Sequence, residues 1–319
     1  MNKTEYPRPQ LQREQWTNLN GEWLFMYDDT NQGMKEKWYT DQTAYQRKIN
    51  VPFVYQSKES GIEERTPHDI VWYSRLFNVD WEMDERVILH FGAVDYESDI
   101  YINGHHVKNH RGGHTSFHVD ITDHLKKKEA QNVAVRVYDP HKDESIPRGK
   151  QFWEEESKGI WYTNSTGIWQ TVWLEVVSAV HFLGVKLMPK FDEGKIEVTA
   201  MINQFEKKQS IDYEITFEGA VIASGNVQLT DKKITFDVDL IQEYIFRTNF
   251  HHDGWSWTPE SPHLFILEIV LNNDSHKEDK ITSYFGMRKI HAEKGMIYLN
   301  NKPYYQKLVL DQGYWPVDY

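Results

Sequence analysis

The sequence contains no cysteine among its 319 residues. That absence excludes disulfide frameworks, thiolate metal sites and a cysteine nucleophile. No apolar run approaches the ~18 residues that a membrane-spanning helix needs. The first residues, MNKTEYPRPQLQREQW, also lack the apolar stretch of a signal peptide. We therefore expect a cytoplasmic protein without a membrane partner.

Basic residues are fewer than acidic residues. The chain has 36 Lys and Arg residues against 48 Asp and Glu residues, a net charge of −12. Nucleic-acid binding depends on basic surface, so this balance argues against a nucleic-acid partner and leaves a neutral ligand compatible. No glycine-rich nucleotide loop and no H-E-x-x-H motif is present. We expect no cofactor.

Helical periodicity is scarce, whereas alternation of apolar and polar residues is common. In NVAVRVYD (132–139), for example, Val133, Val135 and Val137 fall on one face of a strand. Turn signals separate such runs: Asn103-Gly104, Gly112-Gly113, Glu193-Gly194, Glu218-Gly219 and Asn272-Asn273-Asp274. The pattern predicts an all-β protein built of sandwiches.

The spacing of the strands changes near residue 180. Residues 181–287 contain regular strands about 8–12 residues apart, which is typical of a seven-stranded immunoglobulin-like sandwich. Short helical turns are expected in DITDHLKKK (120–128) and LIQEYI (240–245). Beyond residue 287, Asn300-Asn301 predicts a hairpin, and YYQKLVL (304–310) predicts an apolar strand.

Several motifs, in order, resemble those of glycoside hydrolase family 2, which includes β-galactosidases, β-glucuronidases and β-mannosidases. Those similar to its N-terminal sugar-binding domain are LNGEW (19–23), VPF (51–53), VWYSRLF (71–77), LHFGAVDYESDIYINGHHV (89–107), GGHTSFHVDIT (112–122) and TGIWQTVWLE (166–175). Those similar to its later parts are WSWTPESPHLFILEIVL (255–271), FGMRKI (285–290) and GMIYLNNKPYYQKLVLDQG (295–313).

The resemblance implies three parts. These are a jelly-roll, galactose-binding-like β-sandwich (1–180), an immunoglobulin-like β-sandwich (181–287) and a short stub of a catalytic (β/α)₈ barrel (288–319). A complete barrel needs ~250 residues. The family's two catalytic glutamates lie far along the barrel, so we expect no catalytic residue in this chain.

The expected function is therefore that of the non-catalytic N-terminal portion of a retaining exo-glycosidase. Its expected partners are a carbohydrate substrate, the catalytic barrel and, through exposed surface, a second copy of the chain. Two alternatives stay open: a free-standing carbohydrate-binding module and a structural or adhesive β-sandwich protein.

One stretch, PRGKQFW (147–153), has the composition of a functional loop. Arg148 and Gln151 are candidates for binding sugar hydroxyls, and Trp153 is a candidate for stacking on a pyranose ring. In the family that the motifs resemble, a loop from this region reaches the mouth of the barrel. The alternative is that Trp153 fills an interface between domains.

A second candidate lies six residues before Gly167. Galactosidase-like and glucuronidase-like members carry a substrate-binding Asp at that place, whereas this chain has Trp161. The departure implies stacking in place of a hydrogen bond, and it counts against either specificity. By the same resemblance Asp311 and Gln312, after the predicted barrel strand, are candidates for hydroxyl binding.

Other residues in this region are expected to have structural or solvent-exposed positions. Strand alternation assigns Trp169 and Trp173 to packing. Glu154 and Glu156 would share a face of a strand, but runs of like charge are usually solvated. The histidines spaced by four are expected to lie in loops without a metal: His106, His110, His114 and His118.

Overall fold

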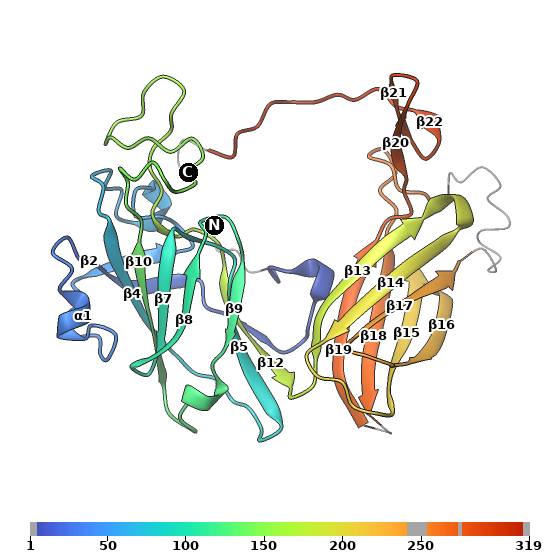
Figure 1. Cartoon of the computed structure of the whole chain (residues 1–319), viewed down its shortest axis with the longest axis horizontal. Coiled ribbons are helices and arrows are strands. Elements are labelled where there is room, and N and C mark those ends of the chain that lie inside the picture. The colour runs from blue at the N-terminus through green and yellow to red at the C-terminus, as the bar shows by residue number, and fades with distance from the viewer. Residues whose placement is uncertain (1–4, 241–253, 274–275, 315–319) are drawn as a thin grey trace. The chain divides into compact units, whose positions relative to one another are not determined.

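The computed structural model describes residues 5–240, 254–273 and 276–314, drawn in colour in Figure 1. It divides into two compact units. Unit 1 comprises residues 1–7, 15–176 and 310–319, and unit 2 comprises residues 8–14 and 177–309. Both units are built of antiparallel strands, which confirms the predicted all-β class. In the described ranges, no helix has the length and apolarity that crossing a membrane requires.

Unit 1 is a β-sandwich. One sheet has the order β3 (Arg47–Val51), β2 (Gly21–Tyr27), β4 (Ile70–Phe77), β10 (Gln131–Tyr138), β7 (Glu97–Ile102) and β8 (His105–Arg111). The other has the order β1 (Trp16–Asn18), β12 (Val172–Ser178), β5 (Glu85–Phe91) and β9 (Phe117–Asp120). A two-stranded ladder pairs β11 (Gly167–Ile168) with β6 (Val94–Asp95). Short helices complete the unit: α1 (Gly33–Glu36), η2 (Lys58–Ser60) and η3 (Thr122–His124).

The central strand β10 shows why the sandwich forms. Val133, Val135 and Val137 are fully buried on the face that the alternation predicts, within a core to which both sheets contribute. The opposite face is buried too, because Ala134 packs in a second cluster with Trp72. Burying apolar area on both faces of one strand contributes roughly 25 cal/mol per Å² removed from water.

Unit 2 contains a second sandwich. Its sheets have the orders β13 (Phe182–Lys190), β14 (Lys195–Ile202), β17 (Lys233–Asp239), and β16 (Ala220–Gln228), β15 (Gln209–Phe217), β18 (Phe265–Asn273), β19 (His276–Phe285). Strands from both sheets share one hydrophobic core. The seven strands described here agree with the immunoglobulin-like prediction. The remaining elements are η1 (Pro9–Leu11), η4 (Phe191–Glu193) and a small sheet of β20 (Ile290–Glu293), β21 (Met296–Leu299) and β22 (Lys302–Pro303).

Three of the predicted turns form as two-residue loops, whereas Asn272 and Asn273, predicted as part of another turn, belong to β18. Asn103 and Gly104 have φ of 49° and 85° between β7 and β8, and Glu218 and Gly219 have φ of 51° and 81° between β15 and β16. Positive φ at both central positions is the type I′ geometry, which matches the twist of antiparallel strands. Asn300-Asn301 joins β21 to β22 in the same way.

Two other predictions have different outcomes. The helical turn expected in 120–128 forms as η3, whereas the one expected in 240–245 lies outside the described residues, apart from Leu240. The strand expected over 304–310 does not form, and Leu308, Val309 and Leu310 are 79%, 92% and 86% exposed. The reason is physical: among the described residues no strand lies alongside to exchange backbone hydrogen bonds with this segment.

A buried ion pair attaches the segment 8–14 to unit 2. Arg13 donates to both carboxylate oxygens of Asp279 on β19, at 3.1 and 2.8 Å, and to the carbonyl oxygen of Phe182 at 2.7 Å. Both charged side chains are only 5% exposed. Gln12 adds a backbone bridge to Thr282. Residues distant in sequence thereby complete the edge of β19.

Replacing one member of this pair leaves the other charge buried. We expect Asp279→Asn to destabilise unit 2 by about 3–5 kcal/mol, measured as lost hydrogen-exchange protection of β18 and β19 amides. Lys280→Met is the control, because Lys280 pairs with Glu268 at the surface and such pairs contribute little. Equal losses in both variants would contradict the assignment of stability to the buried pair.

Candidate functional site

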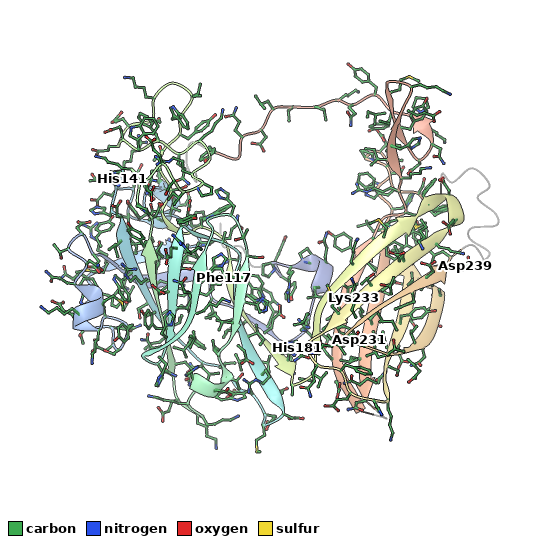
Figure 2. All side chains as sticks on the ribbon, viewed as in Figure 1. Phe117, His141, His181, Asp231, Lys233 and Asp239 are labelled. Carbon is green, nitrogen blue, oxygen red and sulfur yellow. The ribbon has the colours of Figure 1, made fainter. Side chains whose placement is uncertain are left out.

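A long loop after β10 carries most of the predicted site residues. This segment, residues 140–166, is called the aromatic loop here and lies at one end of the strands of unit 1 (green in Figure 1). His141, labelled in Figure 2, lies near its start. The loop closes on itself, because the Phe152 amide donates to the Tyr162 carbonyl at 2.7 Å and the Tyr162 amide donates to Lys150 at 2.9 Å.

The two predicted stacking residues lie side by side in this loop. The rings of Trp153 and Trp161 are 5.5 Å apart between centroids and inclined at 64°. Trp153 is 37% exposed, and the Arg148 guanidinium carbon is 6.0 Å from its ring centre. Arg148 also donates to the carbonyl oxygens of His141 and Asp143. These contacts hold Arg148 beside an accessible aromatic pair.

The C-terminal segment lies against the same loop. Tyr162 donates through its hydroxyl to Oε1 of Gln312 at 2.9 Å, and Tyr314 stacks on Tyr162 with centroids 4.6 Å apart. The Lys150 amide donates to the Tyr314 hydroxyl, and burial raises the pKa of that hydroxyl. Asp311 is exposed and accepts from the Gly313 amide. Gln312 and the Trp pair are thus brought to one region.

Gln151, also predicted to bind hydroxyls, lies inside the protein. It is 4% exposed, and its Nε2 donates to Oδ2 of Asp95 at 2.7 Å. Its Oε1 accepts from Nδ2 of Asn164 at 3.2 Å and from the Ser165 amide at 2.8 Å. These bonds engage both ends of the amide, so Gln151 positions the loop.

A second carboxylate extends this buried network. Asp139, the first residue after β10, accepts from the Thr166 hydroxyl at 2.5 Å. Oδ1 of Asn164 accepts from Nε2 of Gln56 at 2.9 Å, and the Thr166 amide donates to Oε1 of Gln56. We call these side chains the buried network: Gln56, Asp95, Asp139, Gln151, Asn164 and Thr166.

Burial changes the acidity of both carboxyls in the network. Desolvation raises the pKa of Asp95 to about 6, against a lowering by the hydrogen bond from Gln151. Desolvation, followed by the charge of Asp95, raises the pKa of Asp139 to about 7. The cavity beside them is only about 10 Å³, so it has no room for a sugar ring.

Most residues of this network carry no pattern in the sequence that predicts their role. Asp95 gave one signal, since it is an acidic residue within the apolar run GAVDY. The close approach of Gly113, where a Cβ would lie 2.1 Å from Oδ1 of Asp95, is evident only in the structure. Asp139 and Gln56 had no local signal. Their roles arise only when segments distant in sequence meet.

Other predicted residues lie apart from the aromatic pair. Trp173 is 4% exposed and stacks on His90 with centroids 4.7 Å apart, and Trp169 donates to the Gly113 carbonyl at 2.7 Å. Glu154 and Glu156 are exposed and lie in bends, so the strand alternation considered for them does not apply.

The expectation that the four regularly spaced histidines lie in loops is wrong for three of them, since two lie on β8 and one on β9. They contact different neighbours: His106 contacts Asp99, His110 contacts Phe117, His114 contacts Trp169 and His118 contacts His90. Across the described part of the chain, no group of three or more His, Asp or Glu side chains is arranged to hold a metal ion.

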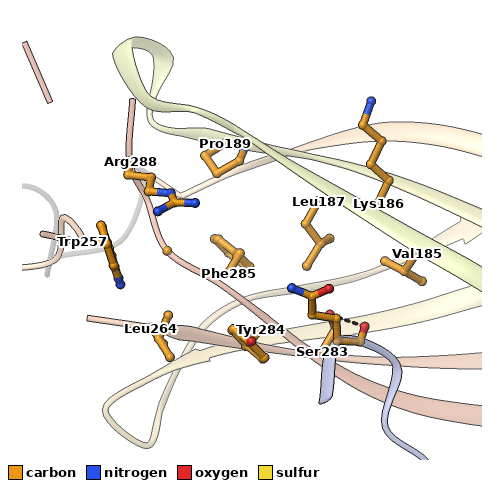
Figure 3. Close-up of a pocket in the computed structure, with 12 residues that line it drawn as sticks. Val185, Lys186, Leu187, Pro189, Trp257, Leu264, Ser283, Tyr284, Phe285 and Arg288 are labelled. Carbon is orange, nitrogen blue, oxygen red and sulfur yellow. Dashed lines mark hydrogen bonds between the residues drawn. The ribbon is translucent and has the colours of Figure 1, made fainter. Parts of the chain in front are cut away.

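Unit 2 has a groove of about 520 Å³, shown in Figure 3. Leu187 and Pro189 of β13 line one part of it. Trp257 and Arg288 line another part, with 4.7 Å between the Trp257 ring centre and the Arg288 guanidinium carbon. Leu264 adds a partly exposed apolar side chain. The groove contains none of the predicted site residues.

Each of the two units matches a model of a known protein family. Residues 16–174 match the model described as "Glycosyl hydrolases family 2, sugar binding domain", and residues 180–288 match "Glycosyl hydrolases family 2". The two matches together cover most of the chain.

Individual relatives are similar over most of the chain but are much longer. A β-galactosidase of Thermoanaerobacter pseudethanolicus is 24% identical over 90% of this chain and 37% of its own length. A β-glucuronidase of Felis catus is 23% identical over 94% of this chain and 48% of its own. The chain thus spans less than half of either protein. Among solved structures, the Lactobacillus rhamnosus β-glucuronidase has a TM-score of 0.71 at 22% identity, covering 93% of this chain and 48% of its own, a likeness in fold.

The buried network makes a prediction about stability. Gln151→Leu removes a donor and an acceptor, which leaves Asp95 and Asn164 with lost hydrogen bonds in the interior. We expect unit 1 to lose about 2–4 kcal/mol, measured by urea unfolding followed by tryptophan fluorescence. Gln312→Leu is the matched control, since its bond to Tyr162 is exposed. A Gln151→Leu variant as stable as this control would refute the positioning role.

Proposed function

Because this chain belongs to glycosyl hydrolases family 2, we propose that it is the non-catalytic N-terminal portion of a retaining exo-glycosidase. In this proposal the two units support a catalytic barrel. The aromatic loop supplies part of the rim of the sugar pocket. The supporting observation is the accessible pair Trp153 and Trp161, with Gln312 attached to the adjacent Tyr162.

The requirements of glycoside hydrolysis support a catalytic site outside the described residues. A retaining glycosidase needs two carboxyl groups about 5–5.5 Å apart with the sugar between them, one of them with a raised pKa. Asp95 and Asp139 have raised pKa values, but both are buried beside a cavity of about 10 Å³. A pyranose cannot enter such a space, so these carboxyls do not meet that requirement.

The aromatic loop is the part of this chain that is best suited to a sugar. Apolar faces of aromatic rings and a few placed polar groups are the usual lining of a ligand site. Trp153 and Trp161 would supply the ring faces, while Arg148, Asp311 and Gln312 would supply polar groups for hydroxyls. The substrate is then a carbohydrate. The relatives include a β-galactosidase and β-glucuronidases. Trp161 stands in place of the family's Asp, which argues against assigning the specificity of either enzyme to this chain.

A second candidate function is a carbohydrate-binding module that needs no barrel. The exposure of Trp153 favours it, because an open aromatic ring can stack on a sugar without further domains. The two functions differ in what completes the site. A binding module would bind sugar as this chain alone, whereas a pocket rim would bind only with the barrel in place.

Location and assembly are further parts of the proposal. The absence of cysteine supports a cytoplasmic location, since secreted proteins more often use disulfides. The exposed apolar residues Leu308, Val309 and Leu310 support a covering partner. We propose the catalytic barrel for this role, with a second copy of the chain as the alternative.

The proposal is tested with aryl β-galactosides and β-glucuronides. This chain alone should give no turnover, whereas a protein extended through the barrel should hydrolyse at least one aryl glycoside. In that protein, Trp153→Ala and Trp161→Ala should each lower kcat/KM about tenfold, equivalent to about 1.4 kcal/mol.

Trp81→Ala is the matched control, because Trp81 is a partly exposed ring beside a cation, Lys127. Turnover by this chain alone would overturn the non-catalytic assignment. Sugar binding by this chain alone, lost in Trp153→Ala, would favour the binding module instead.

A further inference from the structure

The Thr166 hydroxyl lies within hydrogen-bond distance of two acceptors but has one proton to donate. Its Oγ1 is 2.5 Å from Oδ2 of Asp139 and 3.0 Å from Oδ1 of Asn164. With Asp139 ionised, Thr166 donates to only one of these oxygens. With Asp139 protonated, the carboxyl donates to Thr166 and Thr166 donates to Asn164. Because Oδ1 of Asn164 also accepts from Gln56, each of these groups has a partner in either state, but a proton on Asp139 adds one hydrogen bond to the network.

The same chain of bonds reaches the second carboxylate. Asn164 donates to Gln151, and Gln151 donates to Asp95. Asp95 belongs to β6 and Asp139 follows β10, whereas Gln151, Asn164 and Thr166 belong to the aromatic loop. All five side chains are at least 94% buried. The network therefore attaches the loop to two strands of the sandwich.

No cation compensates these carboxylates among the described residues. Arg148 lines the same cavity but donates to backbone carbonyls, and His141 pairs with Asp69 at 2.5 Å. The elements around the carboxylates carry these titratable or charged groups: Tyr55, Asp69, His110, His141, Arg148 and Tyr314. A buried carboxylate without a cation favours its neutral form.

We propose that Asp95 and Asp139 form a proton-dependent latch, in which protonation removes uncompensated buried charge, strengthens the buried network and holds the aromatic loop on unit 1. The latch positions the loop that carries Trp153 and Trp161. It is a property of folded unit 1 and does not depend on the proposed sugar binding.

The direction of the pH effect follows from the shifted acidities. Burial raises the pKa of both carboxyls above the usual value of 3.8, to about 6 and about 7. In the closed state the network holds the loop on unit 1, and in the open state the carboxyls reach water. Between pH 3.8 and about pH 7 the closed state therefore binds more protons than the open state. Its stabilisation is complete at low pH and is lost as the pH rises through the raised pKa values. The loop should open more often in alkaline solution.

Hydrogen exchange of the whole chain, followed by mass spectrometry, tests the latch. Exchange of peptides within 147–166 is measured from about pH 5 to about pH 8, and each rate is divided by the intrinsic rate at that pH. We expect the protection of these peptides to fall at least about tenfold across this range. Peptides from β14 in unit 2 should keep theirs.

Asp139→Asn tests the proton itself, since the amide supplies a permanent donor to Thr166. We expect high loop protection with a weaker pH dependence than in the wild type, because only Asp95 still titrates. Asp143→Asn is the matched control, because Asp143 lies in the same loop but its side chain bonds Ser145, outside the buried network, so this variant should retain the wild-type profile. If the protection of the wild-type loop does not change with pH, the latch is wrong, whether or not the Asp139→Asn variant folds. An unchanged slope in Asp139→Asn, or an equal loss of protection in β14, would also overturn the latch.

Discussion

Buried polar atoms must find hydrogen-bond partners, and this requirement controls how the aromatic loop lies on unit 1. An unsatisfied buried group costs about 1–3 kcal/mol, which is a large part of the stability of a domain. Gln151 and Asn164 meet the requirement through Gln56 and Asp95, which come from distant parts of the chain. Trp153, at the surface, is positioned by these interior contacts two residues away.

The sequence was sufficient to predict features that depend on neighbours along the chain. The alternation of Val133, Val135 and Val137 predicted the buried face of β10, and Asn103-Gly104 predicted its turn between β7 and β8. Such features repeat with the period of the strand or need positive φ at two adjacent residues. The order of family motifs then extended these local predictions to two sandwiches.

The site was less predictable because it depends on contacts between segments far apart. Gln151 had the composition of a surface ligand, but Asp95, 56 residues earlier, bonds its amide in the interior. The predicted strand over 304–310 failed for a related reason, since a strand requires a partner that a local pattern does not specify. Trp161 and Gln312 had signals only through family resemblance, and their sugar contacts remain predictions.

The bond between Arg13 and Asp279 has a consequence for synthesis of the chain. The two residues are 266 positions apart, so Arg13 leaves the ribosome long before its partner exists. Residues 15–176 of unit 1 can fold before unit 2 has been synthesised, because their strands pair among themselves. The segment 8–14 must wait unpaired until β19 has been made. Completion of unit 2 should therefore be a late step of folding, because this contact closes a very long loop.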